Sequence, residues 1–72
     1  MDDPRVAQAA AQFASNLRAA IGRRTVAEVA ITVNMDEDTL RAFIEGRAVP
    51  DLADVVMLEN ALNSDLWPVL PN

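Results

Sequence analysis

Apolar residues recur every three or four positions along most of this chain, in segments bounded by residues that begin and end helices. In the first segment the apolar positions are Val6, Ala10, Phe13, Leu17 and Ile21. This stripe is typical of an α-helix that buries one face. Pro4 suits the first turn of such a helix, where its missing N–H is not needed, and Gly22 suits the residue after the last turn. The pattern predicts a helix over residues 4–21.

The later segments carry similar start and stop signals. Thr25 and Glu28 have the spacing of a capping box, in which each side chain satisfies a free backbone N–H at a helix start. Asp36 and Asp51 can cap the next two segments, and Gly46 can end the third. No stretch of useful length alternates as a strand does. We expect an all-α fold, a compact five-helix bundle in a single domain of residues 1–72, with helices at about 4–21, 25–33, 36–45, 51–62 and 64–68.

The inner positions of these helices predict the hydrophobic core. The expected core residues are Phe13, Leu17, Val29, Leu40, Phe43, Leu58 and Leu62. The same stripes place Val6 in the first helix and Leu52 in the fourth on the inward face. Val56 and Met57 lie beside the inner stripe of the fourth helix, where they could extend an exposed apolar patch.

The composition removes most of the side chains that enzymes use. The 72 residues include no cysteine, histidine or tyrosine, and every cation is an arginine. Thiolate and imidazole metal ligands, imidazole acid–base chemistry and Schiff-base chemistry are therefore excluded. The acidic start and the lack of a long apolar run indicate neither a signal peptide nor a membrane span. We expect a cytoplasmic protein that is not an enzyme, needs no cofactor or metal, and has no membrane partner.

The net charge of −5 is unevenly distributed. Residues 18–47 hold five arginines and five acidic residues, whereas residues 48–72 hold four acidic residues and no cation. A phosphate-binding protein normally has a basic footprint, which is absent from the chain as a whole. The middle of the chain is neutral, so a nucleic-acid partner is compatible only with that part.

The middle of the chain has a more specific pattern, TVAEVAITVNMDEDTLRAFIEGRAVP, from Thr25 to Pro50. It resembles the helix-turn-helix proteins of the phage-repressor and Cro class, also called Xre-like, and the similarity extends from about Leu17 to Leu66. The positions that fall in step are Ala30, where the two motif helices would cross, Met35, Leu40, Phe43, Gly46 and Pro50. The sequence departs from the family where Val26 replaces the usual glutamine, and Asn34 replaces the turn glycine.

The resemblance implies a lambda-repressor-like fold whose second motif helix enters the major groove of DNA. The base-facing positions would be Glu37, Asp38 and Ala42, with Arg41 beside them. Phosphate contacts would come from Arg23, Arg24, Thr25 and Arg47, which flank the motif. The implied function is a small DNA-binding transcriptional regulator of Cro type. Proteins of this class often form homodimers through their last helix, which here would use Leu66, Trp67 and Leu70.

Two alternatives remain open at this point. The acidic stretch Asp36–Asp38 would repel phosphates, so the fold could instead serve as an acidic protein-interaction module, an inhibitor or antirepressor that docks a basic partner. A metal site is a weaker interpretation, because the stretch lacks the spacing of a calcium loop and a helix cap explains Asp36. Trp67 could close the core as a lid or form a dimer contact.

Overall fold

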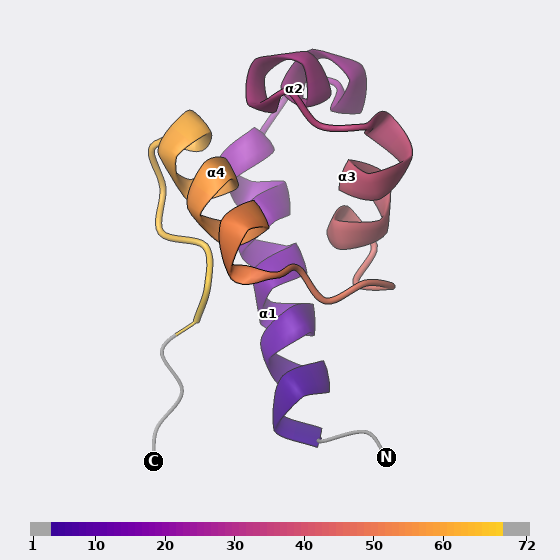
Figure 1. Cartoon of the computed structure of the whole chain (residues 1–72), viewed down its shortest axis with the longest axis vertical. Helices are drawn as coiled ribbons and strands as arrows, with labels where there is room; N and C mark the ends of the chain where they lie inside the picture. Colours follow the sequence, from indigo (N-terminus) through magenta and orange to yellow (C-terminus); the bar gives the residue numbers. More distant parts are fainter. Residues whose placement is uncertain (1–3, 69–72) are drawn as a thin grey trace.

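The computed structural model describes residues 4–68. Within this range it contains four helices and no strand: α1 (Pro4–Ile21), α2 (Val26–Val33), α3 (Glu37–Ile44) and α4 (Leu52–Leu62) (Figure 1). The all-α fold is confirmed. The bounds of these four helices lie within one residue of those predicted, because Thr25, Asp36 and Asp51 act as N-caps whose side chains accept backbone N–H groups of the first turn.

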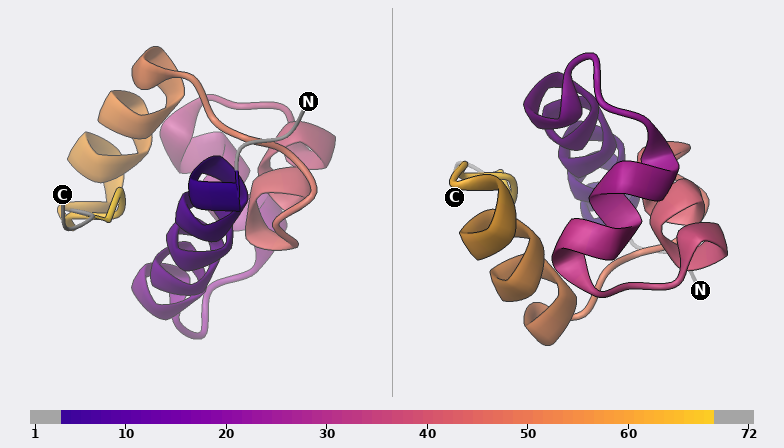
Figure 2. Two further views of the ribbon diagram at one scale, coloured as in Figure 1. Left: turned by 90° about the horizontal axis from the view of Figure 1, so that it is seen from below. Right: turned by 90° about the horizontal axis from the view of Figure 1, so that it is seen from above.

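The helices pack around α1. Helix α1 contacts α3, and α2 contacts both α3 and α4. Helices α3 and α4 lie on opposite sides of α1, and α2 crosses one end of the bundle (Figures 1 and 2). This arrangement gives the molecule two separate outward faces, one on α3 and one on α4.

The predicted core is confirmed. All seven expected residues are buried, and Phe13, Leu17, Val29, Leu40 and Leu58 have no measurable exposure. The ring of Phe13 lies at the centre: its centroid is 6.4 Å from that of Phe43 in an edge-to-face arrangement, and 5.8 Å from that of Trp67. Such aromatic pairs add about 0.5–1.5 kcal/mol beyond their burial. Phe13 therefore ties α3 and the end of the described chain to α1.

Two expected inward residues are exposed. Val6 is 44% exposed and Leu52 is 79% exposed, so the prediction that they face the core is wrong. Val6 is the third residue of α1, and the start of α1 extends beyond the other helices (Figure 1). Leu52 is the first residue of α4. Both residues follow the stripe of their helix, but the described chain does not cover them.

The predicted fifth helix, residues 64–68, is absent from the structure. Asn63 ends α4 in the left-handed conformation with φ 52°. The backbone N–H groups of Leu66 and Trp67 then donate to Oε2 of Glu59, at 2.8 and 3.1 Å, instead of to the carbonyls of a new helical turn. Pro68 has no N–H to donate. The Glu59 side chain of α4 therefore holds the backbone at Leu66 and Trp67, and residues 64–68 form no helix.

Candidate nucleic-acid interface

Helices α2 and α3 are joined by a tight turn of residues 34–36. Asn34 adopts the left-handed conformation with φ 56°, which asparagine tolerates better than most residues that carry a side chain. The N–H of Met35 donates to the carbonyl of Ala30 at 2.9 Å. Asp36 then caps α3, because its Oδ2 accepts from the N–H groups of Asp38 and Thr39 at 3.1 and 3.2 Å. These bonds fix the direction in which α3 leaves α2.

Helix α3 has one buried face and one exposed face. Leu40 and Phe43 are buried in the core. Of the four predicted base-facing residues, Glu37, Asp38 and Arg41 are exposed, and Ala42 is half-buried. The structure therefore brings these residues together on one helix, with their side chains available at or near the surface.

The charge on this exposed face is largely paired within α3. Nη2 of Arg41 lies 3.2 Å from Oε1 of Glu37, an i,i+4 ion pair whose side chains are each about half exposed. Such a pair contributes a few tenths of a kcal/mol, so water or a ligand can replace it at little cost. Asp38 adds a second carboxylate to the first turn. The face is acidic in its first turn and becomes neutral one turn later.

The four predicted phosphate-binding residues occupy different environments. Arg24 donates to the carbonyls of Ala20 and Ile21, at 2.9 and 3.2 Å, and so caps the end of α1. Nε of Arg47 lies 2.6 Å from a carboxylate oxygen of Glu45. The hydroxyl of Thr25 accepts from the N–H of Glu28, which is one half of the predicted capping box; the reciprocal bond from the Thr25 N–H to the Glu28 carboxylate is not formed between these two described residues. Arg23 is exposed and has no hydrogen-bond or ion-pair partner within residues 4–68.

A further arginine, Arg18, connects α1 to the C-terminal end of α3. Nη1 of Arg18, on α1, donates to the carbonyl of Ile44 at 2.6 Å, which satisfies one of the free carbonyls at the end of α3. Sequence reasoning missed this role, because Arg18 and Ile44 are 26 positions apart. The position of Arg18 in the last turn of α1 gave no signal for a contact with another helix.

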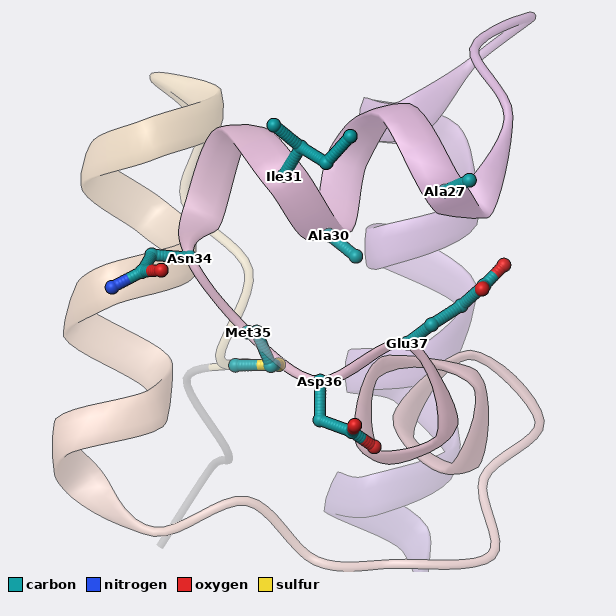
Figure 3. Close-up of a pocket in the computed structure, with 7 residues that line it drawn as sticks. All are labelled: Ala27, Ala30, Ile31, Asn34, Met35, Asp36 and Glu37. Atoms are coloured by element: carbon teal, nitrogen blue, oxygen red, sulfur yellow. The ribbon is translucent and has the colours of Figure 1, made fainter.

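A hollow of about 610 Å³ lies in the corner between α2 and the start of α3 (Figure 3). Its lining residues are Ala27, Ala30, Ile31, Asn34, Met35, Asp36 and Glu37. In Figure 3 Glu37 extends towards the Ala27 end of α2, while Asp36 turns towards the first turn of α3 that it caps. Ile31 is 82% exposed at the rim. Sequence reasoning missed this residue, which lies outside the buried α2 positions Val29, Ala30 and Val33.

The predicted dimer residues are placed differently from one another. Leu66 is buried in the core of its own chain, and its carbonyl accepts a hydrogen bond from Nδ2 of Asn16 at 2.8 Å. Trp67 packs its ring against Phe13 yet remains 38% exposed, so it closes the core and still presents part of its surface. Leu70 lies outside the described residues. The homodimer stays a prediction. Of the predicted contact residues that the structure describes, Trp67 is exposed and Leu66 is buried.

The carboxylate of Glu59 holds the end of the described chain. The two N–H groups of Leu66 and Trp67 lower the pKa of Glu59 below its ordinary value of 4.5, and partial desolvation opposes this effect. The stability that these bonds contribute is therefore fully present above the ordinary pKa, and it is lost as the pH falls through the lower folded-state pKa.

We expect Glu59→Gln to destabilise the protein most near neutral pH. The difference in free energy of unfolding between wild type and Glu59→Gln should shrink as the pH falls from 4.5 through the lower folded-state pKa of Glu59, because the folded wild-type carboxylate is neutral below that pKa. Thermal unfolding across a pH series measures this difference. A difference that stays constant down to the acid limit would contradict the role assigned to Glu59.

Within the described residues, no group of three or more carboxylate, histidine or cysteine side chains is placed to hold a metal ion. None of the helices in that part of the chain is long and apolar enough to span a bilayer. Comparisons of the chain with protein-family models, with curated proteins and with solved structures gave no match.

Proposed function

We propose that this protein is a small DNA-binding transcriptional regulator of Cro type, in which α2 and α3 form a helix-turn-helix. The observation that supports the proposal is the geometry of α2, the turn and α3. A left-handed Asn34 joins two short capped helices, and the second helix is anchored by Leu40 and Phe43 while its other face is exposed. In helix-turn-helix proteins the second helix lies in the major groove with its N-terminal residues near base edges.

In this proposal the residues before the motif supply the first phosphate contact. Arg23 is the natural candidate, because binding a phosphate would break no bond that it makes within residues 4–68. Arg47 would exchange Glu45 for a phosphate, and Arg41 would exchange Glu37 for a guanine edge. The carboxylates of Glu37 and Asp38 could accept from the N4 amino group of cytosine. With few cations involved, the salt dependence of binding should be shallow.

A second candidate is the acidic interaction module, and the pairing of charges favours it. Arg41 and Arg47 are bonded to carboxylates of their own segment, Glu37 and Glu45, and Arg24 caps α1. The backbone N–H groups at the start of α3, which could otherwise bind a phosphate, are partly occupied by Asp36. The carboxylate of Asp38 has no ion-pair partner within the described residues, so a basic protein partner would meet it without displacing a cation first.

A mobility-shift assay with a random-sequence duplex at low salt tests the proposal. Wild-type protein should retard the duplex, and Arg23→Ala should weaken binding to all sequences alike, since a phosphate contact carries no sequence information. Added salt should weaken the shift only gradually, because few phosphates are neutralised. Under the second candidate, the wild-type protein leaves the duplex unshifted even at the lowest salt concentration, and this outcome would remove the DNA-binding proposal.

A further inference from the structure

The outer face of α4 carries an apolar groove that the proposed function does not use. The groove has a volume of about 390 Å³, and its lining residues are Pro50, Leu52, Val55, Val56, Glu59 and Trp67. The four α4 positions among them follow steps of three, one and three, so they form one stripe along the helix. The segment that follows α4 runs back beside it and contributes Trp67 as the opposite wall.

Several apolar side chains in and beside this groove are exposed. Leu52 and Val56 are exposed, Trp67 is partly exposed, and neighbouring Val49 and Met57 are exposed as well. Single exposed apolar side chains need no explanation, but a groove whose lining includes exposed leucine and valine side chains and a tryptophan indicates a binding surface. A groove lined by positions one helical turn apart suits the anchoring side chains of an amphipathic helix.

The charge around the groove defines the chemistry of its occupant. Residues 48–72 carry four acidic residues and no cation. Glu59 lies in the wall, where Oε2 accepts the two backbone N–H groups, and Oε1 has no hydrogen bond within the described residues. Asp51, the N-cap of α4, lies in the chain between two lining residues. The groove is therefore apolar along its length and acidic at its margins.

Three kinds of occupant fit this surface poorly. Nucleic acid and an anionic lipid surface would both bring negative charge against Asp51 and Glu59, and residues 48–72 hold no cation to offset it. A second copy of this chain, as in the homodimer predicted through Trp67, would place two sets of the same acidic residues together, and like charges across an interface are unfavourable. A cationic segment with apolar side chains meets neither obstacle.

We propose that the groove of Leu52, Val56 and Trp67 binds a basic amphipathic segment of another protein, with apolar side chains in the groove and a cation on Glu59. This inference goes beyond the proposed function and does not depend on it, because α4 and α3 lie on opposite sides of the molecule (Figures 1 and 2). DNA on α3 and a protein segment on α4 could be bound at the same time, which would let a regulator recruit a basic partner.

Trp67 provides the readout, because it is the only tryptophan of the chain and lines the groove. The probe is a synthetic amphipathic helix with leucine along one face, arginine along the other, and no tryptophan. Its titration into the full chain should shift the Trp67 emission to shorter wavelength and reach saturation, as the exposed part of the indole is covered. The shift should weaken with added salt. A peptide of the same pattern with glutamate in place of arginine should give no shift.

Two matched substitutions locate the binding. Leu52 and Ile31 are both exposed apolar residues at helix surfaces, 79% and 82% exposed, on different helices. Leu52→Ser should weaken binding of the arginine peptide by about tenfold, since a leucine side chain loses its burial, whereas Ile31→Ser should leave it unchanged. Neither substitution alters a charge or a buried side chain. Both variants should keep the helical circular dichroism of the wild type.

Several results would overturn this inference. These are an unchanged emission with the arginine peptide, an equal response to the glutamate peptide, and equal affinities of wild type and Leu52→Ser. A shift of Trp67 emission with protein concentration alone, abolished in Leu52→Ser, would assign the groove to a second copy instead. DNA retardation by the Leu52→Ser variant reports separately on α3, so failure of one proposal is distinguishable from failure of the other.

Discussion

Phe13→Ala should remove a large part of the stability of this protein and lower its unfolding temperature sharply. The Phe13 side chain is fully buried, and its ring contacts both Phe43 on α3 and Trp67 after α4. Truncation of a buried phenylalanine costs about 3–5 kcal/mol. A chain of 72 residues has a total stability of about 4–10 kcal/mol at the usual values per residue. Thermal unfolding followed by far-ultraviolet circular dichroism should show a large fall in the midpoint temperature.

Val6→Ala is the matched control for this substitution. Val6 lies on the same helix, two turns before Phe13, but is 44% exposed. Its replacement should change the free energy of unfolding by less than about 0.5 kcal/mol. If Phe13→Ala unfolds at the same temperature as Val6→Ala, the ring is not at the centre of the core, and the packing of α1 against α3 described above is incorrect.

The sequence predicted the core well because periodicity identifies the inward face of each helix. It failed at Val6 and Leu52 for a physical reason: a stripe shows which direction a residue faces, but not whether another element covers it. Val6 is in the first turn of α1, whose start extends beyond the other helices, and Leu52 lines the groove beside α4. The end of an amphipathic stripe is thus where burial is least predictable from sequence.

The absent fifth helix has a different cause. The local signals after Asn63 favoured a short helical turn, but the Glu59 carboxylate, seven and eight positions earlier, accepts the N–H groups of Leu66 and Trp67. A bond between a side chain of one helix and the backbone beyond its end has no periodic signature. The choice between a helical turn and an extended segment therefore depended on a contact that sequence patterns do not encode.

The sequence identified which residues could form the candidate DNA interface, but not which hydrogen bonds and ion pairs their side chains make. Arginines before and after the motif were identified from their spacing, yet Arg24 caps α1 and Arg47 pairs with Glu45. Each of these arginines has several acceptors close to it in sequence, so the sequence does not indicate which acceptor it binds. Whether an arginine is available for a ligand depends on side-chain conformations that compete within a few tenths of a kcal/mol.

Neutralising the first turn of α3, by Glu37→Gln with Asp38→Asn, should strengthen binding to random-sequence DNA by about tenfold at low salt. Two like charges near phosphates are removed, each worth on the order of 1 kcal/mol in water, and Arg41 loses the partner that pairs with it. Sequence preference should weaken at the same time, because carboxylates that accept from cytosine are lost. Competition mobility-shift assays with specific and random duplexes measure both effects.

The control changes the net charge equally on the other side of the molecule. Asp54→Asn with Asp65→Asn alters residues on and after α4, away from α3 (Figure 1). If this variant gains as much DNA affinity as the α3 variant, the effect comes from total charge and α3 is not the contact surface. If the α3 variant gains no DNA affinity, and instead loses binding to a basic protein that wild type retains, the exposed carboxylates of Glu37 and Asp38 are the functional groups. The helix-turn-helix then serves as an acidic interaction module, in which Arg41 orients a carboxylate instead of reading a base.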